Sequence, residues 1–320
     1  MKKVILRTLI SLFFIGLLFY MVRDDVPEIA RVLRNINCWL AAIAIVIFLL
    51  TVFVLAKRLQ IIFEAEEIPI SFLSAVNLTF IGYFFNNFLP TSVGGDIVKA
   101  MCASRVTSEP VKSLTSVLMD RIFGLFTFIM IPSVSLLFFL KEIQNPTIPV
   151  LIYSFLVFSI FLFFLLFNRD IAKRFQFIET LLNTVKLGSK ARKIYDGLHK
   201  FKDHKNLIVK ALLLSVIGQS VNILVLYLMA LALGARANIL YFYLLVPVVH
   251  LISMLPSLNG LGIREGAYIY FLSPYIGKEY AAAIGILWLG LLFLLSVIGG
   301  VIYLVRHDYH IRFKEVTASS

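Results

Sequence analysis

Residues 38–56 read CWLAAIAIVIFLLTVFVLA, a run of 19 residues that contains no charged side chain. A helix of about 20 apolar residues is long enough to cross the hydrocarbon core of a bilayer. Comparable apolar runs cover 4–22, 114–140, 147–167, 207–233 and 280–305. The sequence therefore predicts six full membrane spans.

The composition of the whole chain indicates the same class of protein. Of 320 residues, 60% are hydrophobic and 15% are charged, and the mean hydropathy is +0.93. A soluble domain is roughly 45–50% apolar and about 25% charged. The two cysteines, Cys38 and Cys102, lie on opposite predicted sides of the membrane, so we expect no disulfide. We expect an all-α polytopic membrane protein with a single transmembrane domain over 1–320.

The basic residues between the spans predict the orientation. Ten Lys and Arg lie in 168–206, and the positive-inside rule places such a segment in the cytoplasm. Lys2 and Lys3 before the first span, and Lys57 and Arg58 after the second, follow the same rule. We therefore expect cytoplasmic N- and C-termini and a location in the cell (inner) membrane. No small-x-small cleavage site follows the first apolar run, so we also expect an uncleaved N-terminal anchor.

Two further apolar regions, 71–106 and 234–276, are interrupted by Gly, Pro, Asn and charged residues. The first turns at LPTSVGGD (89–96) and the second at LPSLNGLG (255–262). The number of spans on either side of each region predicts its orientation. Both ends of 71–106 should lie on the cytoplasmic side of the membrane, and both ends of 234–276 on the outer side. Such paired segments are typical of transporters built on an inverted repeat. We expect two oppositely oriented broken or re-entrant helical hairpins, with Pro90, Gly94, Gly95, Pro256, Gly260 and Gly262 in their turns.

Charged residues in apolar surroundings mark the candidate site. Asp120 and Arg121 lie inside the run 114–140. An ionised side chain at the bilayer centre costs roughly 3 kcal/mol on insertion scales, so both need partners. Further charged residues follow the two turns. Together with Asp120 and Arg121 they make three acids and three bases, so a pocket that contained all six would have no net charge. The six residues are Asp96, Lys99, Asp120, Arg121, Arg264 and Glu265.

The functional interpretation of this set is a site for a lipid headgroup. Arg121 and Arg264, assisted by Lys99, would bind an anionic group, because arginine can clamp a phosphate with two hydrogen bonds. Backbone N–H groups at Gly-rich turns also favour anions. The acids Asp96, Asp120 and Glu265 would pair with the bases or couple to protons, and Asn86, Asn87 and Asn259 would line a polar cavity.

A purely structural interpretation of the same residues stays open at this stage. Asp96 and Glu265 could cap helices, and Asp120 and Arg121 could be partners across helices. The asparagines could only bridge helices, and the glycines and prolines could only permit close packing and sharp turns.

The segment 168–206 repeats apolar residues at helical spacing, and its polar positions are basic. Helices of this kind lie on an anionic cytoplasmic leaflet, although a plain cytoplasmic linker fits equally well. The sequence contains no nucleotide, metal or nucleophile motif. We therefore expect no enzymatic activity, no cofactor, no metal and no nucleic-acid partner. Membrane lipids are the expected partners, and a homo-oligomer stays open.

Three blocks of sequence resemble the lysylphosphatidylglycerol synthase transmembrane family, also called flippase-like membrane proteins. They are NFLPTSVGGDIVKA (87–100), DRIFGL (120–125) and LPSLNGLGIREGA (255–267). Lys99 stands where many members carry Arg, which keeps the charge and loses the bidentate fork. In larger relatives this membrane unit is joined to a soluble synthase domain. Here the chain ends about 15 residues after the last span, so we expect a stand-alone member without lysyl transfer.

These observations together predict a lipid flippase or transporter. Its cargo would be a lipid with an anionic headgroup, moved between the leaflets. A phospholipid, an aminoacyl-phospholipid and a polyprenyl-linked glycolipid are the candidates. Two alternatives stay open: an integral-membrane lipid or glycosyl transferase, and a membrane partner of a cell-envelope glycosyltransferase.

Overall fold

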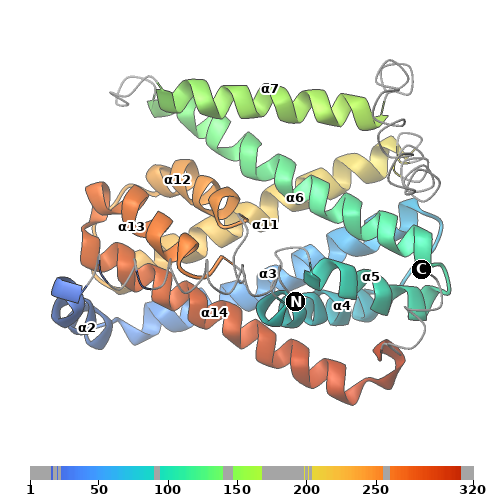
Figure 1. Ribbon diagram of the computed structural model, residues 1–320, viewed down its shortest axis with the longest axis horizontal. Coiled ribbons are helices and arrows are strands. Elements are labelled where there is room, and N and C mark those ends of the chain that lie inside the picture. Colours follow the sequence, from blue (N-terminus) through green and yellow to red (C-terminus); the bar gives the residue numbers. More distant parts are fainter. Residues whose placement is uncertain are drawn as a thin grey trace.

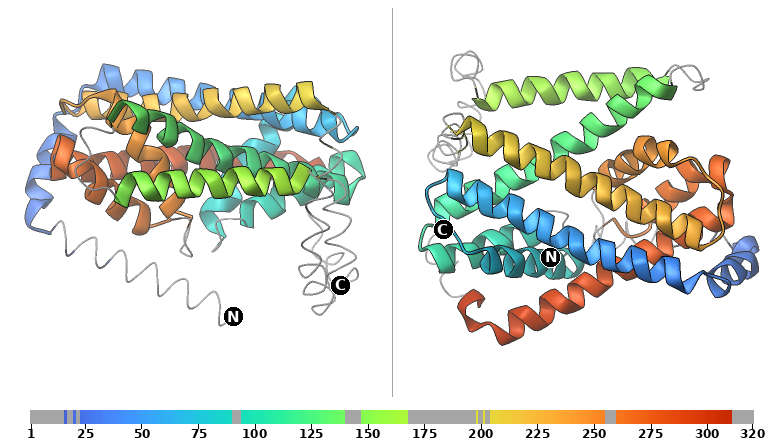
Figure 2. Two further views of the ribbon diagram at one scale, coloured as in Figure 1. Left: turned by 90° about the horizontal axis from the view of Figure 1, so that it is seen from above. Right: turned by 180° about the vertical axis from the view of Figure 1, so that it is seen from behind.

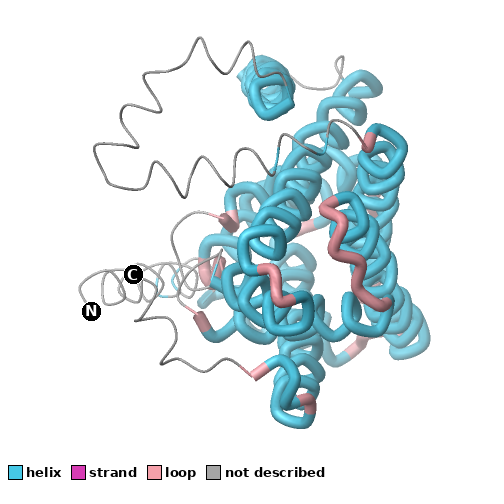
Figure 3. Tube along the Cα trace, turned by 90° about the vertical axis from the view of Figure 1, so that its right-hand side faces the viewer, coloured by secondary structure: helices cyan, strands magenta, loops and turns pink. Residues whose placement is uncertain are grey.

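The computed structural model describes residues 16, 20, 23–89, 94–139, 147–167, 198, 201, 204–254 and 260–310, and all regular structure within them is helical (Figure 3). The elements are η1 (Arg23–Asp25), α2 (Val26–Arg34), α3 (Cys38–Ala65), α4 (Phe72–Phe88), α5 (Gly94–Thr107), α6 (Pro110–Phe139), α7 (Thr147–Phe167), α11 (Lys205–Ala232), α12 (Ile239–Ile252), α13 (Ile263–Ile276), α14 (Lys278–Val305) and η3 (His307–Tyr309). The expected all-α class is confirmed.

Four helices are long and apolar enough to cross a bilayer: α3, α6, α11 and α14. They coincide with four of the expected spans. Helix α7 covers the fifth, 147–167, and packs along α6 at one edge of the bundle (Figure 1). The first expected span, 4–22, lies almost entirely outside the described residues. The total of six spans therefore stays a prediction.

Short polar side chains set where several of these helices begin. The Asn37 side chain accepts hydrogen bonds of 3.1 Å from the backbone N–H groups of Trp39 and Leu40 at the start of α3. Ser71 caps α4 in the same way, and Asn238 caps α12. These contacts satisfy N–H groups that have no partner within the helix, which is costly to leave unmet near a membrane.

The eight helices that form the centre of the bundle divide into two equivalent halves, α3–α6 and α11–α14. Helices α3 and α11, each of 28 residues, pack side by side (Figure 2). In this division α3, α4, α5 and α6 correspond in order to α11, α12, α13 and α14. The principal helix contacts then occur in matching pairs: α4–α14 matches α12–α6, α5–α6 matches α13–α14, and α3–α6 matches α11–α14. This pairing is what an internal repeat requires.

Each half contains one helical hairpin with a break at its tip. The arms of the first are α4 and α5, of 17 and 14 residues, and both arms of the second, α12 and α13, have 14. Each arm is shorter than the roughly 20 residues that a full span needs. The expected turn residues Pro90 and Pro256, like Asn259, lie outside the described residues. The opposite and re-entrant orientation of the hairpins stays a prediction.

Glycines allow the hairpins to approach their neighbours closely. A Cβ atom on Gly95 would lie 2.5 Å from the carbonyl oxygen of Gly82, so this position holds α5 against α4. A Cβ atom on Gly299 would collide with the backbone carbonyl of Phe80, so α14 packs directly on α4 there. Gly260 and Gly262 adopt φ values of +75° and +80°, a conformation that side chains disfavour, before α13 begins.

Most of the basic segment 168–206, including its expected surface helices, lies outside the described residues. Two of its apolar residues are described. Leu198 and Phe201 are buried against Ile61, Met119 and Phe123 of α3 and α6. Part of the expected apolar face is therefore covered by protein.

The close contact at Gly299 leads to a prediction on stability. Replacing Gly299 by Ala forces α14 away from α4, and we expect the free energy of unfolding to fall by about 1–3 kcal/mol. The measurement is thermal unfolding of the purified protein in detergent. Gly290 on the same helix has open space around its Cβ position, so Gly290→Ala should unfold at or above the wild-type temperature. Equal melting temperatures for the two variants would contradict this packing.

Candidate functional site

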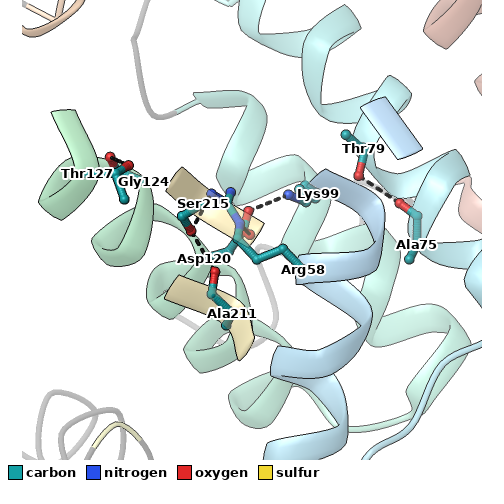
Figure 4. Close-up of polar contacts among 9 residues, drawn as sticks. All are labelled: Arg58, Ala75, Thr79, Lys99, Asp120, Gly124, Thr127, Ala211 and Ser215. Atoms are coloured by element: carbon teal, nitrogen blue, oxygen red, sulfur yellow. Dashed lines mark hydrogen bonds and ion pairs between the residues drawn. The ribbon is translucent and has the colours of Figure 1, made fainter. Parts of the chain in front are cut away.

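One buried carboxylate lies among side chains from four helices inside the bundle (Figure 4). Arg58 Nε of α3 donates to Asp120 Oδ1 of α6 at 2.7 Å, and Lys99 Nζ of α5 donates to Asp120 Oδ2 at 3.0 Å. Arg58 Nη1 also donates to the Ser215 hydroxyl of α11 at 3.0 Å. That hydroxyl donates in turn to the Ala211 carbonyl. We call Arg58, Lys99 and Asp120 the ion triad.

The ion triad is buried and carries an excess positive charge. All three side chains are at most about a tenth exposed, and two cations share one anion. Removing charges from water is costly, and partners repay the cost only when the geometry is good. Each oxygen of the Asp120 carboxylate accepts a short hydrogen bond from a cation, so its negative charge is well stabilised. The triad as a whole has a net formal charge of +1, because two cations face one carboxylate.

The triad lies at a similar depth in the three long helices that contribute to it or touch it. Arg58 is seven residues before the end of α3, and Asp120 and Ser215 are each ten residues after the start of α6 and α11. These separations correspond to about 10–15 Å along the helix axes. Ile62 and Ala211 lie one turn nearer the ends of α3 and α11, and both belong to an apolar cluster that also includes Met119. The charges are thus separated from that end of the bundle.

A second ion pair lies beside the triad and is more accessible. Arg121 Nη1 is 3.3 Å from Asp96 Oδ2, and the two side chains are 28% and 15% exposed. Asp96 is the third residue of α5, so its charge also interacts favourably with the N-terminus of that helix. Asp120 and Arg121 are consecutive residues of α6, and Asp120 belongs to the buried ion triad, whereas Arg121 belongs to the more exposed pair with Asp96. We call the triad and this pair the two charge clusters.

The two charge clusters line one cavity of about 190 Å³. It is large enough for several water molecules or a small polar group. Its lining contains three cations and two carboxylates together with the polar side chains of Tyr83, Asn86, Gln219 and Asn222. Gln219 Nε2 and Asn222 Oδ1 are buried and have no hydrogen-bond partner among the described residues. The described lining therefore has a formal charge of +1 and unused hydrogen-bonding capacity.

The expected neutral cluster of six charges is divided in the structure. Asp96, Lys99, Asp120 and Arg121 line the cavity, as does Asn86. Arg264 and Glu265 do not belong to the described lining. Asn87 bonds the Leu292 carbonyl at 3.1 Å and contacts Ser296, so it bridges α4 and α14 instead. The Asn86 side chain also accepts from the backbone N–H of Gly95 at 3.0 Å.

Arg264 and Glu265 form a separate buried pair at the start of α13. Arg264 Nη2 donates to Glu265 Oε1 at 2.8 Å, and Glu265 Oε2 accepts from the backbone N–H of Gly262 at 2.7 Å. The carboxylate therefore occupies the helix N-terminus that was a candidate anion site. This arrangement corresponds to the capping alternative for Glu265.

The equivalent place in the second half is filled by aromatic side chains. Counting from helix starts, the sixth residue is Lys99 in α5 and Tyr268 in α13, and the eleventh is Asp120 in α6 and Trp288 in α14. His250 bonds the Tyr268 hydroxyl at 3.0 Å and stacks on Trp288. Trp288 also packs edge-on against Phe48. Two similar backbones thus place charged side chains at this position in one half and aromatic side chains in the other.

Arg58 belongs to the site, although the sequence pattern predicts a position at the cytoplasmic boundary. Helix α3 continues to Ala65, so Arg58 lies within it. A signal was present, because Leu59 and the apolar residues 61–63 continue the run beyond Arg58. Ser215 carried no such signal, since a lone serine in an apolar helix has no distinctive pattern. No group of three or more His, Cys, Asp or Glu in the described part of the chain is placed to hold a metal ion.

The fold and this cavity define a helical integral membrane protein with ionised side chains gathered inside the bundle. The family model described as the lysylphosphatidylglycerol synthase TM region matches residues 4–300, and the chain belongs to that family. Comparison with curated proteins and with solved structures gave no significant match.

The shared carboxylate leads to a second prediction. Asp120→Asn leaves Arg58 and Lys99 buried without a counter-charge, and we expect a loss of about 3–5 kcal/mol in unfolding free energy. Glu109→Gln is the matched control, because Glu109 is exposed just before α6. Thermal unfolding in detergent compares the two variants. An Asp120→Asn protein that melts with the wild type would show that the ion triad does not hold the four helices together.

Proposed function

We propose that this protein moves a lipid with an anionic headgroup between the two leaflets of the membrane. The observation that carries the proposal is the cavity between membrane helices, whose described lining has three cations and two carboxylates. A site with this balance favours a negatively charged ligand, and a low dielectric strengthens the attraction. The family of the chain supports a role in membrane lipid chemistry.

The two charge clusters offer successive positions for a phosphate group. Arg121, the more exposed cation, would meet the headgroup first while it stays beside Asp96. Arg58 and Lys99 would then receive it while Asp120 compensates the charge that remains. Arginine suits this role because its planar fork matches two phosphate oxygens.

The surface of the bundle allows the acyl chains to stay in the lipid. Exposed apolar side chains cover the outer faces of the long helices, among them Phe53 of α3, Leu137 of α6 and Phe293 of α14. The headgroup alone would then need a polar path, and the cavity would be one part of it. The protein acts as a transporter in this proposal, and since no nucleotide motif occurs in the sequence, transport is downhill or ion-coupled.

A transfer assay in vesicles tests the proposal. The purified protein is reconstituted with a fluorescent phosphatidylglycerol, and reduction of the outer-leaflet dye measures exchange. We expect Arg121→Gln to lower the rate at least tenfold, because the first phosphate contact is lost. Arg236→Gln is the control, since Arg236 is exposed between α11 and α12, and it should transfer like the wild type. Wild-type rates equal to those of protein-free vesicles would contradict the proposal.

The proposed orientation places the N- and C-termini in the cytoplasm of an inner-membrane protein, supported by the ten basic residues of 168–206. Cys38 is exposed at the start of α3, and Cys102 is buried. A membrane-impermeant maleimide added outside intact spheroplasts should therefore label the wild type and not Cys38→Ser. Labelling that appears only after the membrane is opened would reverse the orientation.

A further inference from the structure

We propose that the headgroup accepted by the cavity is a phosphodiester with a single negative charge that carries hydroxyl groups and no ammonium. This inference rests on the proposed function and specifies its substrate class. It follows from two properties of the cavity, its formal charge and the buried amide groups on α11.

The charge of the cavity selects against zwitterionic and cationic headgroups. The described lining has Arg58, Lys99 and Arg121 against Asp96 and Asp120. One negative charge neutralises the excess of +1. A zwitterion leaves that excess in place, and a lysine-bearing headgroup increases it, which is unfavourable away from water.

The amide groups select for hydroxyls. Gln219 and Asn222 are three residues apart on α11 and therefore lie on one face of the helix. Gln219 is only 5% exposed, and its Nε2 donor, like the Asn222 Oδ1 acceptor, has no partner among the described residues. A hydroxyl can both donate and accept a hydrogen bond. It can therefore bond to the side-chain amide of Gln219 or of Asn222, whichever way the O and N atoms of that amide are placed. An ammonium only donates and leaves the Gln219 N–H unpaired.

The carboxylates of the cavity give an ammonium no suitable position. Both oxygens of Asp120 already accept hydrogen bonds from Arg58 and Lys99. Asp96 Oδ2 accepts no hydrogen bond but lies 3.3 Å from the Arg121 guanidinium. An ammonium there would be the close neighbour of a like charge, whereas a hydroxyl can donate to the same oxygen without that repulsion.

Two kinds of lipid present this chemistry. One is a glycerophospholipid whose phosphate is joined to glycerol, and the other is a polyprenyl phosphate joined to a hexose. Both carry one negative charge and at least two hydroxyls on a single phosphodiester, and both would keep their apolar chains outside the cavity.

Reconstituted vesicles with tail-labelled lipids test the inference. The probes are phosphatidylglycerol, phosphatidylethanol, phosphatidylethanolamine, lysyl-phosphatidylglycerol and a polyprenyl-phosphate hexose. Phosphatidylethanol has the same charge as phosphatidylglycerol and no hydroxyl, so the pair isolates the amide contacts. We expect the wild type to move phosphatidylglycerol about tenfold faster than phosphatidylethanol, and faster than both lipids that carry an ammonium. Faster movement of the polyprenyl-phosphate hexose would support the same headgroup chemistry and identify its source.

Variants of α11 test whether the amides cause the preference. In Gln219→Leu and Asn222→Leu, the ratio of the phosphatidylglycerol to the phosphatidylethanol rate should fall from about ten toward one. Asn206→Leu, at the exposed start of α11, should keep the wild-type ratio. Movement of lipids with no preference for hydroxyls, or faster movement of an ammonium-bearing lipid, would overturn the headgroup assignment alone. No movement of any probe would overturn the proposed function with it.

Discussion

The shared carboxylate of Asp120 is the interaction on which the rest of this structure depends. It binds Arg58 and Lys99 at the same time and so connects α3, α5 and α6, while Arg58 extends the connection to Ser215 of α11. A membrane bundle gains little from the hydrophobic effect, because lipid is as apolar as the protein surface, and packing and polar contacts have to hold the helices together. Here the polar contact that holds the helices also leaves an uncompensated positive charge beside a cavity. Under the proposed function, stability and ligand binding are two consequences of one arrangement.

The two halves of the bundle use the same packing for different purposes. The hairpins α4–α5 and α12–α13 contact α6 and α14 in exchanged order, yet the first half gathers ions where the second stacks His250, Tyr268 and Trp288. Phe128 belongs to the cavity lining and also contacts His250, so the filled region adjoins the polar one. Under the proposed function, the aromatic region closes the path in the observed state, and a rearrangement between the halves would open it.

The sequence was sufficient to predict the helical class, and its charged residues in apolar surroundings include four of the five charged residues that line the cavity. Apolar runs and their interruptions are local features of the sequence, so they can be read without knowing the tertiary contacts. Partners are not local. The sequence pattern places Arg58 at the membrane boundary, because a span of the usual length of about 20 residues that begins at Cys38 ends just before it. The observed α3 has 28 residues and continues past Arg58. Arg264 and Glu265 looked like members of the central cluster because their turn resembles the first one. In the folded protein they satisfy each other and the backbone of Gly262, which only the three-dimensional contacts reveal.

We propose that a lipid phosphate binds between the two charge clusters inside the bundle. A cryo-electron microscopy structure of the protein in phosphatidylglycerol nanodiscs would show where the headgroup lies. We expect phosphate density within the cavity, in contact with Arg121 or with Arg58 and Lys99, and acyl chains that leave the bundle toward the lipid. Headgroup density confined to the outer surface of the helices, with only water in the cavity, would contradict it.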